Sequence, residues 1–272
     1  MPHISSAPLI RLDQAGKRFD GKATLALDGV SATIHPGEFL AVTGRSGAGK
    51  TTLLRCLAGA TPTSAGHIWI GAARLGSLRG RALRAHRARV GMIYQQFNLV
   101  RRLRVLDNVL IGRLPHLRGW RRGAAIFRLF DAEARVCAFR CLDHVGLIDR
   151  AWQRADTLSG GEQQRVAIAR LLAQDARVVL ADEPVASLDV ANGRLVMETL
   201  RRIAKGAGLT VVATLHHVDY ARRYADRVLG LKDGRIVFDG PPGALTETAL
   251  FELFGVVPGE LLDDAPSLLE AS

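Results

Sequence analysis

Gly44-Arg45-Ser46-Gly47-Ala48-Gly49-Lys50-Thr51 lies between the apolar run Phe39-Leu40-Ala41-Val42-Thr43 and a helical pattern at residues 52–57. The octapeptide matches G-x-x-x-x-G-K-[ST], and the flanks supply the strand and the helix that this phosphate-loop motif requires. Glycines let consecutive backbone N–H groups converge on the phosphates of a nucleotide, where a Cβ would block the approach. The positive dipole end of a helix beginning near Gly49 adds to the attraction. The stretch therefore predicts a nucleotide phosphate site.

Two side chains of the motif extend this prediction. Lys50 supplies a positive charge for the outer phosphates, and the Thr51 hydroxyl is placed to ligate Mg²⁺. The alternative is a glycine-rich turn that happens to carry a lysine, which the strand before the motif and the helix after it disfavour. We therefore expect a nucleotide and Mg²⁺ to bind together.

The composition describes a chain with room for a large core. At 272 residues, of which 48% are hydrophobic, it fits one large domain, or one domain with a small appendage. Residues 1–6 lack the charged and then apolar pattern of a secretion signal, and Arg11 and Asp13 interrupt the apolar residues after them. No apolar run approaches the ~20 residues of a membrane-spanning helix. We therefore expect any membrane role to act through a partner protein.

Three cysteines, Cys56, Cys137 and Cys141, do not make a disulfide framework. Cys137 and Cys141 have a spacing that can place them on one helix face. Without a nearby histidine or cysteine pair, ordinary packing is favoured over a zinc site. Cysteine usage therefore predicts a reduced, cytoplasmic protein.

The net charge of +11 is concentrated in one segment. Residues 74–128 contain fourteen arginines, with Asp107 as the one acidic residue among them. Such a segment suits nucleic acid, anionic lipid or an acidic protein surface, and a solvated face in an arginine-rich protein is an equal alternative. Charge alone therefore does not decide the function.

Short apolar runs alternate with helical patterns along the chain, which favours a parallel sheet covered by helices. The runs expected to form strands are residues 9–12, 30–34, 67–71, 90–94, 177–181 and 209–214, and Asp233-Gly234 predicts a hairpin over residues 228–238. Helices are expected at residues 78–89, 105–110, 132–145, 159–172 and 190–205 and past Pro242, with Gly206 and Gly208 ending the helix at 190–205. Ser159 and Glu162 have the spacing of a capping box.

Polar residues follow the buried runs of the predicted sheet. Asp182 and Glu183 end one such run, where ligands of open α/β sheets gather. Asp182 is placed to hold Mg²⁺, directly or through water, and Glu183 to orient or deprotonate a water that attacks the γ-phosphate. Gln95 and His216 follow other runs; an amide can join the Mg²⁺ shell, and an imidazole can donate to the γ-phosphate. Taken alone, these two residues are more often structural, and spacing does not separate His216 from His217.

Leu158-Ser159-Gly160-Gly161-Glu162-Gln163-Gln164-Arg165 decides the class of protein. Alone it is a well-capped helix start and a second potential anion site. Together with the phosphate loop upstream and Asp182-Glu183 downstream, it resembles the signature sequence of ATP-binding-cassette (ABC) ATPases. The resemblance covers residues from about 9 to 240. It implies a P-loop NTPase fold of the α/β class, an ABC-type nucleotide-binding domain with an antiparallel β portion and a helical insertion.

The resemblance implies a role for each matching residue at the nucleotide. Phe19, otherwise an ordinary core aromatic, looks like the residue that stacks on adenine. Gln95 resembles the glutamine that senses Mg²⁺ and meets the transmembrane subunits. His216 matches the γ-phosphate histidine, since it follows its strand directly. The residues that resemble the ATP-contacting loop are Gly44, Arg45, Ser46, Gly47, Ala48, Gly49, Lys50, Thr51 and Thr52.

The signature residues imply that two cassettes work as a pair. Ser159, Gly160 and Gly161 would bind the γ-phosphate of the ATP held by the other cassette, and Ser187-Leu188-Asp189 resembles the loop that contacts the partner. ATP would then bridge the two chains, and hydrolysis would let them part and drive transmembrane permease subunits between inward- and outward-facing states. The expected catalytic residues are Glu183 and His216, and the expected Mg²⁺ ligands are Thr51, Gln95 and Asp182.

Further stretches look closest to the ATP-binding subunit of phosphonate importers, at residues 95–100, 105–112, 181–189 and 214–221. Arg45 and Val190 stand where proline is common in relatives, but neither side chain is expected to bind phosphate or metal. The resemblance implies a peripheral protein at the cytoplasmic face of the inner membrane. Its implied partners are permease subunits and, indirectly, a substrate-binding protein, with no nucleic acid.

The expected organisation is a disordered N-terminus at residues 1–8, an ATP-binding domain at residues 9–240 with a helical insertion at about 103–172, and a helical extension with an acidic tail at residues 241–272. Three alternatives stay open. One is the ATPase subunit of another importer, such as one for polar amino acids. A second is a nucleic-acid-associated ABC ATPase, which a single cassette without a long coiled-coil insertion disfavours. The third is an inactive regulatory cassette, which the presence of Lys50, Asp182, Glu183 and His216 disfavours.

Overall fold

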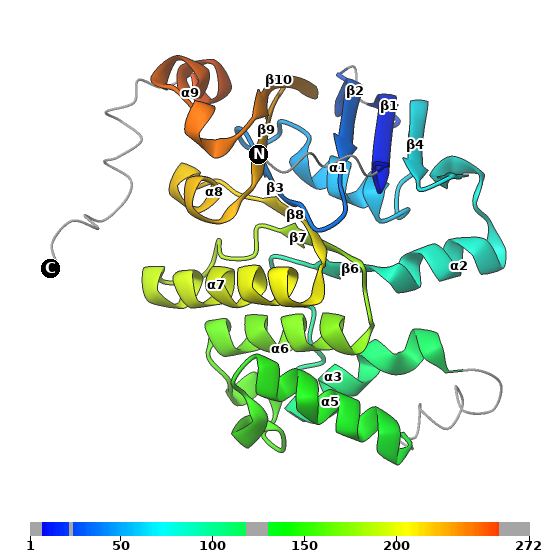
Figure 1. Ribbon diagram of the computed structural model, residues 1–272, viewed down its shortest axis with the longest axis vertical. Helices are drawn as coiled ribbons and strands as arrows, with labels where there is room; N and C mark the ends of the chain where they lie inside the picture. The colour runs from blue at the N-terminus through cyan, green and yellow to red at the C-terminus, as the bar shows by residue number, and fades with distance from the viewer. Residues whose placement is uncertain (1–6, 22–23, 118–129, 256–272) are drawn as a thin grey trace, which may run out of the picture.

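Two β-sheets and a group of helices make up the residues that the computed structural model describes, 7–21, 24–117 and 130–255 (Figure 1). The strands are β1 (Ile10–Lys17), β2 (Leu27–Ile34), β3 (Phe39–Thr43), β4 (Ala65–Ile70), β5 (Ala73–Arg74), β6 (Val90–Ile93), β7 (Val178–Asp182), β8 (Thr210–Thr214), β9 (Arg227–Lys232) and β10 (Arg235–Gly240). The helices are α1 (Lys50–Leu57), α2 (Gly80–Arg89), α3 (Val105–Leu110), α5 (Ala132–His144), α6 (Gly160–Ala173), α7 (Val190–Ala207), α8 (Val218–Tyr224) and α9 (Glu247–Phe254).

The larger sheet is mixed and has the strand order β10-β9-β3-β8-β7-β6. All neighbours are parallel except β9 and β10, which form the predicted hairpin. Every residue of β3 and β8 is buried, because alternate side chains enter two different cores. In β8, Val211 and Ala213 pack on one face, and Val212 packs on the other with α1. Burial on both faces explains why these strands read as continuous apolar runs.

The smaller sheet is antiparallel and has the order β2-β1-β4-β5. Along β1, Ile10 and Leu12 are buried and Arg11 is exposed, so this sheet packs one face on the core and turns the other to solvent. The buried face lies in the same core as Leu53 and Leu54 of α1. The structure therefore confirms the predicted antiparallel portion, although β1 is longer than the expected strand at residues 9–12.

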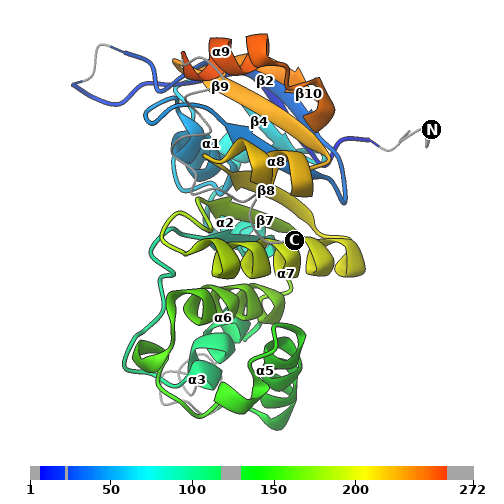
Figure 2. The ribbon, with the colours of Figure 1, turned by 90° about the vertical axis from the view of Figure 1, so that its left-hand side faces the viewer.

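Helices α3, α5 and α6 pack on one another and form the end of the molecule that lies opposite the antiparallel sheet (Figure 2). Their shared core contains Val109, Ala138 and Ile168, all of them buried. A Cβ at Gly112 would lie 2.2 Å from the carbonyl oxygen of Arg170, so the chain after α3 approaches α6 closely. The predicted helical insertion is confirmed as a feature of the fold.

Glycines end α7 and turn the hairpin between β9 and β10. Gly208 has φ of 62° and its N–H bonds to the carbonyl of Ala204, which ends α7 as expected. Gly206 lies inside α7, so the prediction that it also ends the helix is wrong; the left-handed residue, not the first glycine, stops the helix. Asp233 and Gly234 have φ of 50° and 79°, the values of a tight hairpin turn.

Several predictions fall on residues outside the described ranges. These are the disorder of residues 1–6 and the acidic tail with Glu260, Asp263 and Asp264. The short helix predicted past Pro242 is confirmed by α9. Within the described ranges, no helix combines the length and the apolar character needed to cross a membrane.

Candidate active site

The phosphate loop is a tight glycine turn that leads directly into α1. Gly44, Gly47 and Gly49 have φ of 144°, 83° and 103°, which side chains rarely adopt. A Cβ at Gly44 would lie 2.1 Å from the carbonyl oxygen of Leu231, and one at Gly49 would lie 2.3 Å from that of Ala26. Close contacts with the backbone of other segments therefore require both glycines. The turn and the N-terminal end of α1 together have the geometry of an anion site.

Lys50 holds its ammonium group over this loop and is 5% exposed. Its Nζ donates to the carbonyl oxygens of Gly44 at 2.7 Å and Arg45 at 3.0 Å. Burial lowers the pKa of Lys50, and the nearby carboxylates of Glu183 and Asp182 oppose that shift. The fold therefore sets one buried cation next to two carboxylates at the mouth of the loop.

Thr51 and Asp182 are far apart in the sequence but contact each other in the structure. Thr51 Oγ1 donates to Asp182 Oδ1 at 3.0 Å, although 131 positions separate the two residues. A hydroxyl and a carboxylate are oxygen ligands of the kind that Mg²⁺ prefers. The donor set therefore fits the cation that the sequence predicts.

Glu183 occupies an unusual backbone conformation at the end of β7. Its φ of 49° lies in the left-handed region, which non-glycine residues seldom occupy. Its carboxylate is in hydrogen-bond contact with Nε2 of His216, which follows β8. His217 instead packs its ring edge-on to Tyr220. The structure thus separates the two histidines, which the sequence did not, and pairs His216 with Glu183.

Thr214, the last residue of β8, connects these carboxylates and was not predicted as a site residue. Its Oγ1 donates to Asp182 Oδ1 at 3.0 Å and accepts the N–H of Glu183 at 2.8 Å. The sequence carried one signal for it, a hydroxyl at the end of an otherwise apolar strand. That signal is weak alone, because threonine is common in strands.

A pocket of about 310 Å³ opens between the phosphate loop and the segment that joins β1 to β2. Phe19 lines it, as expected for a residue that contacts a base, and the Lys17 ammonium lies 5.1 Å from the centroid of the Phe19 ring. Its other lining residues are Thr24, Leu25, Ala26, Ser46, Gly47, Gly49, Lys50, Thr51, Thr52 and Glu183. Thr24, Leu25 and Ala26 were not predicted, since nothing in their residue types indicates a ligand.

The signature residues lie at the N-terminus of α6, and none of them lines this pocket in the described part of the chain. Ser159 Oγ accepts the N–H of Glu162 at 3.3 Å, and Glu162 Oε2 accepts the N–H of Ser159 at 2.9 Å. This confirms the predicted capping box, and the bond from the Ser159 N–H lowers the pKa of Glu162. Ser159, Gly160 and Gly161 therefore lie at a helix start outside the pocket that the phosphate loop lines.

The loop with Asp189 packs against the signature within the same chain. A Cβ at Gly161 would lie 2.7 Å from Asn192 Oδ1, and one at Gly160 would lie 3.1 Å from the Leu188 side chain. Asp189 caps α7 by accepting the N–H of Asn192 at 2.9 Å, and this bond lowers the pKa of Asp189. The Asp189 loop and the signature thus form one continuous surface.

Gln95 follows β6, as predicted, but its side chain is exposed and does not line the pocket. Phe97 and Asn98, just after it, have φ of 51° and 52°. Arg170 of α6 donates to the carbonyl oxygen of Asn98 at 2.7 Å and to that of Phe97 at 3.4 Å. The Gln95 loop is therefore attached to the signature helix, and no hydrogen bond among the described residues joins Gln95 to Thr51 or Asp182.

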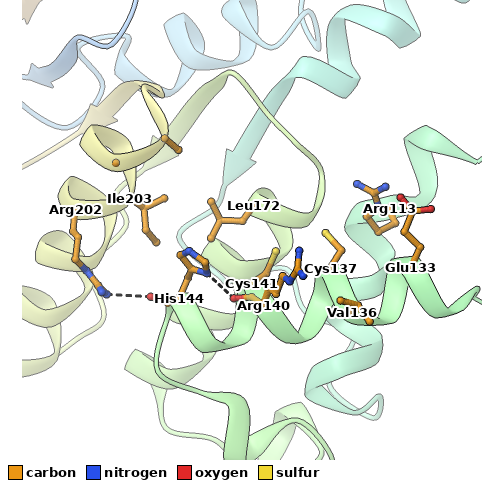
Figure 3. A pocket seen from close by; sticks show the side chains of 12 residues that line it. Arg113, Glu133, Val136, Cys137, Arg140, Cys141, His144, Leu172, Arg202 and Ile203 are labelled. Atoms are coloured by element: carbon orange, nitrogen blue, oxygen red, sulfur yellow. Dashed lines mark hydrogen bonds between the residues drawn. The ribbon is translucent and has the colours of Figure 1, made fainter.

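A second and larger groove, of about 770 Å³, lies between α5, α6 and α7 (Figure 3), and no residue of the phosphate loop lines it. Cys137 and Cys141 share the face of α5 that lines it, as their spacing predicts. Burial raises the pKa of the Cys141 thiol to about 12, so this group stays protonated at neutral pH. Among the described residues, no three His, Cys, Asp or Glu side chains are grouped so that they could hold a metal ion.

Comparison with known proteins places this geometry in a family. A family model described as ABC transporter matches residues 27–186. The phosphonates import ATP-binding protein of Rhodopseudomonas palustris (strain BisB5) is 48% identical over 249 residues, which are 92% of this chain and 90% of that protein. The protein of the same name from Oceanobacillus iheyensis is 41% identical, over 93% of this chain and 98% of its own length.

Solved structures show the same fold. A dimeric ATP-binding cassette in a post-hydrolysis state, bound to ADP and Pi, superposes with a TM-score of 0.74 at 32% identity, over 86% of this chain and 98% of that chain. A protein from Clostridium perfringens that is part of an ABC transporter complex superposes with a TM-score of 0.78 at 25% identity, over 91% of this chain and 94% of that chain. With a family model that matches more than half of its length and relatives 48% identical over 92% of it, the chain belongs to the ABC transporter family, as one of its ATP-binding cassette ATPases.

Proposed function

We propose that this ATPase powers phosphonate import as the ATP-hydrolysing subunit of an ABC import complex. The observation that carries the proposal is the 48% identity, over 92% of the chain, to a relative named as a phosphonates import ATP-binding protein. The stretch at residues 214–221, which resembles phosphonate importers, supplies Thr214 and His216, and both contact Glu183 in the proposed site. The ATPase subunit of another importer is the nearest alternative.

In this proposal the phosphate loop, residues 44–52, holds the phosphates of ATP with backbone N–H groups, and Phe19 stacks on the adenine. Lys50 leaves the carbonyls of Gly44 and Arg45 and donates to the outer phosphates instead. Thr51 and Asp182 would hold Mg²⁺, and Gln95 is proposed as a further ligand. When bound, Mg²⁺ would neutralise charge on the outer phosphates.

Glu183 and His216 are the proposed catalytic residues. The Glu183 carboxylate orients an attacking water and takes its proton, a role supported by its position at the pocket edge beside Lys50. His216 is in contact with that carboxylate in this structure, and we propose that its N–H donates to the γ-phosphate instead once ATP is bound. The left-handed backbone of Glu183 is consistent with a site that keeps a strained geometry for chemistry.

The functional unit of the proposal is a dimer. Ser159, Gly160 and Gly161 of one chain bind the γ-phosphate of the ATP held by the other, and Asp189 contacts the partner. Two observations support this arrangement: the signature does not line its own chain's pocket, and a cassette of similar fold is dimeric with ADP and Pi bound. ATP binding would close the dimer and hydrolysis would open it.

We place the dimer at the cytoplasmic face of the inner membrane, bound to permease subunits and, through them, to a substrate-binding protein. We propose residues 9–240 as the cassette, with its helical insertion at about 103–172, and residues 241–272 as an extension. Its helix α9 packs against β9 and β10, because Leu253 fills the space that a Cβ at Gly230 would need. No nucleic acid is a partner in this proposal.

The test is to purify the tagged chain from solubilised membranes of its native host and to identify what accompanies it. We expect membrane permease subunits together with a protein that binds phosphonate. If a permease for a different solute accompanied the chain, the ATPase role would stand, and phosphonate would be wrong as the transported substrate. Ribosomes or DNA that stay bound through a salt wash would replace the importer with a nucleic-acid-associated ATPase.

The arginine ribbon, Arg101, Arg102 and Arg104, gives a prediction about recruitment. These side chains are exposed, and Arg104 lies 5.5 Å from the ring centroid of Trp152, which is 62% exposed. Cations beside an exposed tryptophan suit the boundary between membrane headgroups and the permease. Reversing all three arginines to glutamate should weaken recruitment to membranes by about tenfold or more, measured as the fraction of chain that sediments with them.

A matched control separates this surface from net charge. Reversing Arg177, Arg202 and Arg223, which lie on other elements, changes the charge equally and should leave recruitment near the parent level. ATP binding should be unchanged in both variants, because neither set lines the pocket. Equal loss of recruitment in the two variants would count against a specific role of the arginine ribbon.

A further inference from the structure

The parallel register of β7 and β8 sets Thr214 directly beside Asp182 at the carboxyl end of the sheet. Thr214 is 0% exposed, so water cannot replace the hydrogen bonds of its hydroxyl. That hydroxyl has one proton to donate and can accept in return. It therefore has to divide its bonds among the groups that surround it.

Two consecutive residues of the proposed site use this hydroxyl. Its proton goes to Asp182 Oδ1 at 3.0 Å, since the other acceptor in reach, the carbonyl oxygen of Ala181, is 3.5 Å away. Its lone pair accepts the N–H of Glu183 at 2.8 Å. One hydroxyl thus orients the carboxylate of Asp182 and fixes the peptide that carries Glu183.

The hydrogen bond from the Glu183 N–H to the Thr214 hydroxyl helps to stabilise the unusual backbone conformation of Glu183. A left-handed φ of 49° costs energy for a glutamate and persists where neighbouring bonds hold it. The same bond satisfies an N–H at the point where β7 ends and its ladder with β8 stops. Without the hydroxyl, the Glu183 peptide is free to turn toward a more common conformation.

The bond to Asp182 complements the one from Thr51. Asp182 Oδ1 accepts from both hydroxyls at 3.0 Å. The Thr51 hydroxyl is the one proposed to turn to Mg²⁺, and it then no longer restrains the carboxylate. The Thr214 hydroxyl is buried at the end of β8, and we expect it to keep its bond to the carboxylate when Mg²⁺ is bound.

We propose that Thr214 is a positioning residue that holds the Asp182 and Glu183 carboxylates together in their working geometry. This proposal deepens the proposed ATPase mechanism and rests on it. Thr214 does not line the pocket beside the phosphate loop, and in this proposal it acts through the carboxylates of Asp182 and Glu183. Valine has nearly the same shape and lacks the hydroxyl, so it would fill the same space and remove both bonds.

The experiment compares Thr214→Val, Thr214→Ser and the matched control Thr210→Val. Thr210 lies at the other end of β8, is 1% exposed, and also has a hydroxyl that accepts a backbone N–H, that of Gly37 at 3.0 Å. The measurements are kcat and KM for ATP, and binding of a fluorescent ATP analogue with Mg²⁺ and with EDTA. Melting temperatures of all variants show how much each substitution affects the fold.

For Thr214→Val we expect kcat to fall by about 10–100-fold, the usual effect of removing a group that orients a metal ligand. Analogue affinity in EDTA should stay within about twofold of the parent, because the residues lining the pocket are unchanged, while the gain in affinity that Mg²⁺ gives should shrink. Thr214→Ser should restore both quantities, since it restores the hydroxyl. Thr210→Val should match the parent in kcat and in Mg²⁺ dependence.

Two results would overturn the proposal while leaving the ATPase in place. One is a Thr214→Val variant with the kcat and Mg²⁺ dependence of Thr210→Val, and the other is a serine variant as impaired as the valine variant. If Thr214→Val does not fold, Thr214→Ala removes the hydroxyl without an added methyl group. Its kcat and Mg²⁺ dependence are then compared with those of Thr210→Val and Thr214→Ser. A parent protein without Mg²⁺-dependent hydrolysis would overturn the proposal together with the mechanism on which it rests.

Discussion

Glu183→Gln is expected to lower kcat for ATP hydrolysis by about 10²–10⁴-fold, the usual range for loss of a general base. Glutamine has nearly the same shape and can still bond to His216, but its amide cannot take a proton from water. ATP affinity should be no weaker than that of the parent, because Lys50 and the glycine turn are untouched. The change also removes a negative charge beside the place of the γ-phosphate, which favours the ATP-bound state.

The same variant should accumulate as a dimer in the presence of ATP and Mg²⁺. Binding closes the pair, and without hydrolysis nothing opens it. Phosphate release and the elution volume on size exclusion measure the two effects in one sample. Glu252→Gln, an exposed residue on α9, makes the same chemical change away from the site and should behave as the parent. A Glu183→Gln protein that hydrolyses ATP at near the parent rate would remove Glu183 from its assigned role.

Lys50→Ala is expected to weaken ATP binding by about 10–100-fold, the equivalent of one lost hydrogen bond to a charged group. The Lys50 ammonium group is buried at the loop, so we expect that a lysine on the surface cannot take its place in the variant. The parent and the variant are compared by titration with a fluorescent ATP analogue. Because Glu183 and Asp182 would lose their nearby cation, turnover should fall with binding.

Lys50 also bonds to two loop carbonyls, so a control has to separate loss of the charge from damage to the fold. Lys205→Ala, an exposed position on α7, removes a lysine without touching the loop and serves as the reference for melting temperature and affinity. If Lys50→Ala bound the analogue as tightly as Lys205→Ala, the charge at the loop would not be a nucleotide contact. The phosphate site would then have to depend on backbone N–H groups alone.

Patterns that act over a few residues translated directly from sequence into structure. The capping box at Ser159 and Glu162 forms as its spacing predicts, because both partners belong to one helical turn. The hairpin at Asp233-Gly234 forms because two adjacent residues accept left-handed backbone angles. Gly206 shows the limit of such rules. A glycine weakens a helix, but the hydrogen bonds of neighbouring residues continue α7 through Gly206, and the helix ends at Gly208.

Contacts between residues that are distant in the sequence could not be predicted from local patterns. The pairing of Glu183 with His216, and the separation of His216 from His217, depend on how the ends of β7 and β8 align. The carbonyl oxygen of Ala26 lies against Gly49 of the phosphate loop because β2 begins at the next residue. The residue type of Ala26 does not predict this contact. The sequence predicts Gln95 beside Mg²⁺, yet in this structure its loop is attached to α6 through Arg170.

The sequence by itself determined the phosphate loop, the strands with both faces buried and the class of protein, since these depend on residue type and short spacing. The tertiary structure decided which hydroxyls meet which carboxylates. Thr51, Asp182 and Thr214 are far apart in the chain, and they converge because strand order and register bring the ends of parallel strands to one edge. Register is a property of the whole sheet and is chosen by packing on both of its faces. No local pattern of residues contains it.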